Sequence, residues 1–86
     1  MHRLTVIFSG DVQGVGFRRA TQKKALELNV CGTVENLTDG SVKAEIEGDL
    51  PTLFTLIQTL ATIFSLTKTE LTFESSPEKL SGFSIL

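Results

Sequence analysis

The order of the hydrophobic periods along this chain limits its fold more than any other feature. Residues 4–9 and 42–47 alternate outward and inward side chains with a period of two, which is typical of β-strands. Residues 17–29 and 50–64 carry apolar side chains every three or four positions, which is typical of amphipathic helices. Further strands are predicted at residues 30–36, 66–74 and 83–85.

The resulting order is strand, helix, strand, strand, helix, strand, with a short strand at the end. Two right-handed β-α-β crossovers with both helices on one face predict an α+β, ferredoxin-like split βαβ sandwich. A length of 86 residues is expected to form one domain, residues 1–86. This fold hosts many unrelated functions, so the function has to be argued from particular residues.

The pattern also makes local predictions. Asn29 is expected to end the first helix in a left-handed conformation, and Asp49 to precede the second helix as its N-cap. Leu71 and Phe73, near the end of the fourth strand, are predicted to face the core. Residues 75–77 are predicted to form a loop.

Composition and charge exclude several classes of function. The net charge of −2 gives no global attraction for nucleic acid. Cys31 and His2 are the single residues of their types, so neither an internal disulfide nor a Cys/His zinc site can be assembled. The uncharged stretch 50–67 is interrupted by polar residues and predicts no membrane span. Without a visible signal peptide, the cytoplasm is the expected compartment.

A glycine-rich loop between the first strand and the first helix is the most informative segment. Its glycines let successive backbone N–H groups face one concavity, and the helix dipole behind them favours an anion. Arg18, in the first helical turn, can bind two phosphate oxygens and stays charged. A tight connection with a surface arginine is the alternative. The predicted phosphate-binding residues are Asp11, Val12, Gln13, Gly14, Val15, Gly16, Phe17 and Arg18.

Asn36 is the second candidate. It has the same parity as Val34, so it is expected to point toward the helix-covered face near the end of its strand. A neutral amide can donate and accept at once, which suits holding a water molecule against an electrophile. The alternative is that Asn36 caps the hairpin turn at residues 38–40, which the residue alone favours. The sequon at residues 36–38 is discounted because no secretory signal precedes it.

Together these two segments resemble the acylphosphatase family. The match is carried by VQGVGFR at residues 12–18, by GTVEN at residues 32–36 and by DGSV at residues 39–42. Gly48 and the SGF at residues 81–83 fit as well, so the likeness extends over nearly the whole chain. The resemblance implies a five-stranded, mostly antiparallel sheet with two helices on one face.

The resemblance also implies an activity. It implies hydrolysis of the carboxyl–phosphate anhydride bond of acyl phosphates to a carboxylate and inorganic phosphate. By this likeness Arg18 is the catalytic phosphate-binding residue, Asn36 positions the attacking water, and residues 11–16 supply the phosphate cradle. No metal or other cofactor is implied. The expected partner is a small acyl phosphate, with no nucleic acid and no membrane, and the expected form is a monomer.

The chain departs from the family pattern around these candidates. Arg19 stands where many members have an aromatic residue, and Thr33 where many have Trp or another large residue. Residues 61–65 lack a Gly-Pro pair that many members carry. Arg19 could assist substrate recognition, but a solvated arginine is the favoured interpretation. Asp11 is expected to point outward because a carboxylate would repel phosphate.

Two rival functions share this fold. One is a non-catalytic ferredoxin-like module that binds phosphate or a small molecule. The other is the acylphosphatase-like domain of a hydrogenase-maturation carbamoyltransferase, in which zinc-finger cysteines would follow the last strand. An RNA-binding sheet would need exposed aromatic residues on its central strands. The first strand instead offers Thr5, Ile7 and Ser9 on its other face.

Overall fold

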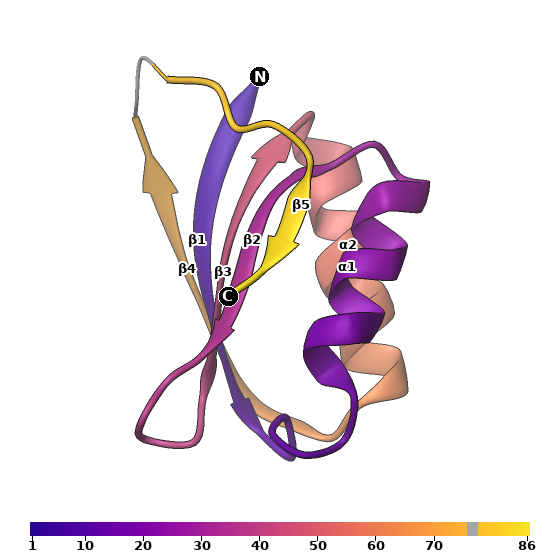
Figure 1. Cartoon of the computed structure of the whole chain (residues 1–86), viewed down its shortest axis with the longest axis vertical. Helices are drawn as coiled ribbons and strands as arrows, with labels where there is room; N and C mark the ends of the chain where they lie inside the picture. The colour runs from indigo at the N-terminus through magenta and orange to yellow at the C-terminus, as the bar shows by residue number, and fades with distance from the viewer. Residues whose placement is uncertain (76–77) are drawn as a thin grey trace.

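The computed structural model describes residues 1–75 and 78–86, and Figure 1 shows a sheet with both helices on one of its faces. This arrangement confirms the predicted α+β, ferredoxin-like sandwich. The strands are His2–Gly10 (β1), Cys31–Asn36 (β2), Val42–Gly48 (β3), Leu66–Glu74 (β4) and Phe83–Ile85 (β5). The helices are Phe17–Glu27 (α1) and Leu50–Ile63 (α2).

The sheet has the strand order β4-β1-β3-β2-β5. Three of the neighbouring pairs are antiparallel, and β5 lies parallel to β2, so the sheet is mostly antiparallel as predicted. Ile46 of β3 lies opposite Leu4 of β1 and opposite Gly32 of β2. This register places the alternating apolar residues of the three central strands on one face, toward the helices.

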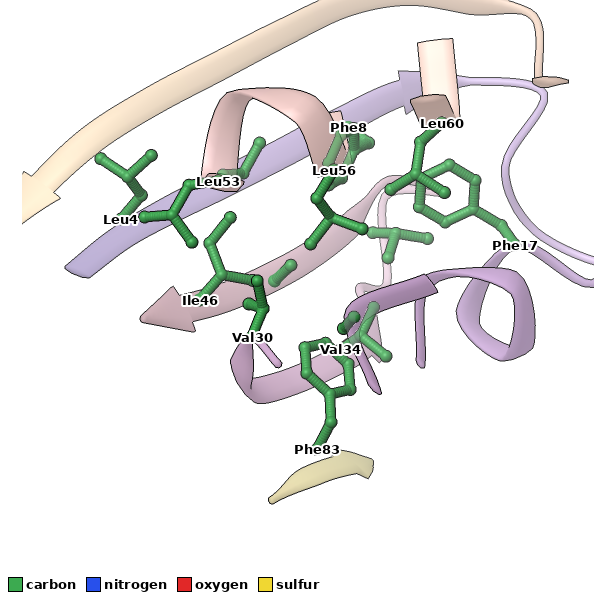
Figure 2. Packing of buried hydrophobic residues seen from close by; sticks show 14 of the residues in the cluster. Leu4, Phe8, Phe17, Val30, Val34, Ile46, Leu53, Leu56, Leu60 and Phe83 are labelled. Carbon is green, nitrogen blue, oxygen red and sulfur yellow. The ribbon is translucent and has the colours of Figure 1, made fainter. Parts of the chain in front are cut away.

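The core fills the space between this face and the helices, as Figure 2 shows. The β1 residues Leu4 and Phe8 are at most 1% exposed, which matches the alternation in the sequence. The ring of Phe17 lies with its centroid 5.0 Å from that of Phe8 and 4.8 Å from that of Phe64. These contacts fix the first residue of α1 against the sheet, and the loop before α1 is fixed with it.

The prediction that Leu71 and Phe73 face the core is wrong. Their partners on β1 are Val6 and Leu4, so both side chains do lie on the helix side of the sheet. However, β4 is an edge strand, and the helices pack over β2, β3 and β5. Leu71 and Phe73 therefore remain 40% and 63% exposed. Alternation identifies the face of a sheet but cannot say how far the helix layer extends.

The local predictions on helix ends agree more closely with the structure. Asn29 has a φ of 58°, which confirms the left-handed conformation, although α1 ends two residues earlier than expected. Asp49 is the N-cap residue of α2, but its side chain makes no capping hydrogen bond. Of the loop predicted at residues 75–77, Ser76 and Pro77 lie outside the described residues. No helix in the described part of the chain is long and apolar enough to cross a membrane.

Candidate active site

The two candidate segments meet at one end of the molecule. Figure 1 shows the loop between β1 and α1 beside the hairpin that joins β2 to β3, at the bottom of the view. The glycine-rich loop follows β1, a central strand of the sheet. Asn36 is the last residue of β2, which is separated from β1 by β3. The sheet therefore brings Arg18 and Asn36 together although they are 18 positions apart along the chain.

The loop is held at both ends by packing and hydrogen bonds. The Asp11 N–H donates to the Ser65 carbonyl at 2.9 Å, and the Val12 side chain is only 1% exposed. At its other end, the buried Phe17 ring anchors the first turn of α1. The exposed residues between these anchors are thus presented on a fixed base.

The middle of the loop forms a concavity of backbone donors. Gly14 and Gly16 have φ angles of 76° and 81°, a left-handed conformation that favours glycine, and they flank Val15. Within the described chain, the N–H groups of these three residues donate no hydrogen bond. Gly16 caps α1 without a side-chain bond, and the first turn holds no acidic residue. Such donors at a helix N-terminus are suited to an anion.

Arg18 is held at the edge of this concavity. Its Nη1 donates to the backbone oxygen of Leu86 at 3.1 Å, and the side chain is half-buried. The Leu86 N–H in turn donates to the Val34 carbonyl at 2.8 Å, which continues the pairing between β5 and β2. The sheet edge therefore orients the guanidinium, and its remaining N–H groups are left for a ligand.

Asn36 is exposed at the end of β2, opposite the buried Val42. In residues 1–75 and 78–86, its side-chain amide has no hydrogen-bond partner. The hairpin turn is closed instead by Asp39, which accepts from the Ser41 N–H at 3.0 Å and from the Ser41 Oγ at 2.5 Å. These two hydrogen bonds lower the pKa of the Asp39 carboxyl. The amide of Asn36 is thus available to a water molecule or a substrate.

Gln13 connects the two segments. Its Nε2 donates to the Leu37 carbonyl at 2.8 Å and to the Ser41 carbonyl at 2.9 Å. The side chain therefore ties the glycine-rich loop to the hairpin that carries Asn36. Sequence reasoning placed Gln13 in the loop but missed this role, because both acceptors are backbone carbonyls whose positions depend on the fold.

Replacing Gln13 by alanine is expected to lower kcat/KM for an acyl phosphate by about 10-fold, because the distance between loop and hairpin is no longer fixed. Gln22→Ala is the matched control, since Gln22 Nε2 also donates to a backbone carbonyl, that of Phe83 at 2.9 Å, and Gln22 is outside the pocket lining. Steady-state kinetics and urea denaturation measured on both variants check this. Equal kinetic losses in the two would show that Gln13 only stabilises the fold.

The candidates line one pocket of about 360 Å³. Of the predicted phosphate-binding residues, Asp11, Gln13 and Val15 are not in its lining, and Asp11 is exposed as expected. Arg19 and Ile85 do line it; the sequence had favoured a solvated arginine over a role of Arg19 in substrate recognition, and it had not indicated Ile85. No carboxylate side chain of the described residues is in the lining. The lining consists of Val12, Gly14, Gly16, Phe17, Arg18, Arg19, Asn36 and Ile85.

The chain is similar to acylphosphatases both in sequence and in structure. The family model described as Acylphosphatase matches residues 4–85. A curated acylphosphatase from Thermococcus kodakarensis is 41% identical over 80 residues, which cover 90% of this chain and 87% of that protein. The crystal structure of acylphosphatase from Bacillus subtilis is 31% identical, has a TM-score of 0.93, and matches over 100% of this chain and 99% of its own.

Other relatives are matched over shorter segments. An acylphosphatase from Methanospirillum hungatei is 44% identical over 61 residues, which cover 71% of this chain and 67% of that protein. For several further relatives the matched part of the chain spans about half of their length. The highest sequence identity is therefore confined to part of the chain, whereas the family model and the structural match extend over nearly all of it.

Proposed function

Because the chain belongs to the acylphosphatase family, and is by that membership a hydrolase of acyl phosphates, we propose that Arg18, Asn36 and the backbone of residues 11–16 carry out this reaction. The reaction splits the carboxyl–phosphate anhydride bond into a carboxylate and inorganic phosphate. The observation that carries the proposal is the pocket of about 360 Å³, which Arg18, Asn36, Gly14 and Gly16 line together.

In this proposal the phosphate group of the substrate occupies the concavity of the loop. The N–H groups of Gly14, Val15 and Gly16 and the guanidinium of Arg18 then face its oxygens. Phosphoryl transfer depends mainly on positioning and on stabilising charge, and these donors supply both. A phosphate bound there lies in front of the positive, N-terminal end of the α1 dipole.

Asn36 holds the attacking water in this arrangement. Its amide oxygen accepts a hydrogen bond from the water while its N–H₂ donates to a phosphate oxygen, so the water is aligned with the phosphorus atom. Water attacks phosphorus, the bond from phosphorus to the acyl oxygen breaks, and the carboxylate leaves. No carboxylate or histidine lines the pocket among the described residues, so an oxygen of the substrate phosphate takes the proton of the water.

The reaction is proposed to need no metal, and residues 1–86 are proposed to act as one domain and a monomer. One chain supplies every residue of the candidate site, so no partner subunit is needed to complete it. In the described part of the chain, no three His, Cys, Asp or Glu side chains come together. The cytoplasm is the expected compartment for such a small-molecule hydrolase.

The direct test is hydrolysis of benzoyl phosphate and acetyl phosphate by the purified chain, with EDTA present in one arm. We expect release of inorganic phosphate at the same rate in both arms. Loss of activity with EDTA would contradict the metal-independent reaction. Phosphate binding without any hydrolysis would favour a non-catalytic ferredoxin-like module, and carbamoyl transfer to an added acceptor would favour the carbamoyltransferase reading.

A further inference from the structure

The pocket contains a second arginine that the proposed reaction does not use. Arg19 lines the same pocket as Arg18, yet its environment differs. Arg18 is half-buried and donates to the backbone oxygen of Leu86. Arg19 is exposed, and within residues 1–75 and 78–86 it makes neither a hydrogen bond nor an ion pair. Its positive charge is thus uncompensated at the mouth of the site.

Helix geometry separates the two guanidinium groups. Arg18 and Arg19 are consecutive residues of α1, so their side chains leave the helix about 100° apart. A phosphate held by Arg18 therefore does not require Arg19. Both nevertheless line one pocket, so the two guanidinium groups can act on different parts of one substrate.

The rest of the lining shows what else the pocket can bind. Ile85, which is 38% exposed, supplies apolar surface, against which the carbon chain of an acyl group can lie. No carboxylate of the described residues lines the pocket, so the charge of Arg19 is not neutralised there. An acyl group with its own negative end can thus lie on apolar surface and reach a cation.

We propose that Arg19 forms an anion subsite for the acyl end of the substrate, so that acyl phosphates with a negatively charged acyl group are preferred. This inference rests on the proposed function. It commits to a substrate class with two anionic ends, in which a phosphate lies at Arg18 and a carboxylate or a second phosphate lies at Arg19. Arg19 is here a specificity-determining residue, and it takes no part in the bond cleavage.

The test compares two acyl phosphates of equal carbon number, succinyl phosphate and butanoyl phosphate. We expect the wild type to prefer succinyl phosphate, and Arg19→Gln to lower kcat/KM for it by about 3- to 5-fold, the range of an exposed ion pair. For butanoyl phosphate the change is expected to stay below about 1.5-fold. Arg19→Lys keeps the charge and should keep most of the preference. Added salt should reduce the preference of the wild type for succinyl phosphate.

Lys23→Gln is the matched control. Lys23 lies one helical turn beyond Arg19, is outside the pocket lining, and its replacement removes the same charge. An equal loss of preference in this variant would overturn the subsite in favour of a diffuse field. Equal losses on both substrates in Arg19→Gln would overturn it by placing Arg19 at the phosphate. A wild type that hydrolyses both substrates equally also contradicts the subsite, whereas one that hydrolyses neither contradicts the proposed function.

Discussion

Replacing Arg18 by alanine is expected to lower kcat for acetyl or benzoyl phosphate by at least about 100-fold, the scale of removing one donor to a developing oxyanion. The guanidinium is the charged side chain that the structure orients at the glycine-rich loop, through its hydrogen bond to the backbone oxygen of Leu86. Its loss removes a bidentate charge from the transferring phosphate. The affinity of the Arg18→Ala variant for inorganic phosphate, measured by calorimetry or as competitive inhibition of its residual activity, should fall as well.

Two variants sharpen this prediction. Arg18→Lys keeps a positive charge but offers a point charge in place of a planar fork, so we expect it to recover phosphate binding better than turnover. Lys24→Gln removes a cation of α1 that is already paired with Glu27 at 3.5 Å, outside the pocket, and should change kcat by less than about 2-fold. Thermal unfolding should be nearly the same for all three variants. An Arg18→Ala protein of normal activity would rule out the proposed role.

The sequence was sufficient for the fold because each element carried its own signal. The period of two in residues 4–9, the helical period in residues 17–29 and the glycines between them fix which element follows which. Asn29, with its φ of 58°, shows that a left-handed residue after a helix could be predicted from one residue type, although the helix itself ends at Glu27. These signals are local, so they do not depend on contacts between distant parts of the chain.

What the sequence could not predict depends on distant parts of the chain. The exposure of Phe73 follows from the width of the helix layer, which no pattern within β4 records. The hydrogen bonds of Gln13 depend on where the β2–β3 hairpin places two carbonyl groups. The contact between Arg18 and Leu86 depends on β5 pairing with β2. All three are consequences of tertiary structure, and two of them lie at the candidate site.

The hairpin shows the same limit at a single residue. From the sequence, Asn36 could either hold water or cap the turn, and the second reading was favoured for an isolated asparagine. In the structure Asp39 makes the capping bonds to Ser41, and the amide of Asn36 has no partner in the described chain. The structural reason to keep Asn36 for the turn is thereby weakened, and its role can be separated from that of Asp39 by experiment.

Replacing Asn36 by alanine is therefore expected to lower kcat by about 100-fold with little change in KM, because Asn36 orients the water and is not the main phosphate ligand. Stability should change by less than about 0.5 kcal/mol, since the exposed amide makes no bond that the variant would lose. Asn36→Asp keeps the shape but cannot donate to a phosphate oxygen. It also places a negative charge beside the phosphate, so it should lower kcat as much and raise KM.

Asp39→Ala is the control that separates water positioning from turn capping. Its loss removes both bonds to Ser41, so the midpoint of thermal unfolding should fall while kcat changes little. If Asn36→Ala instead lowers the unfolding midpoint and keeps more than half of the wild-type kcat, Asn36 belongs to the turn. If Asp39→Ala lowers the unfolding midpoint and Asn36→Ala lowers kcat, Asp39 caps the turn and Asn36 positions the water. The two residues of one hairpin then have separate roles, one in stability and one in catalysis.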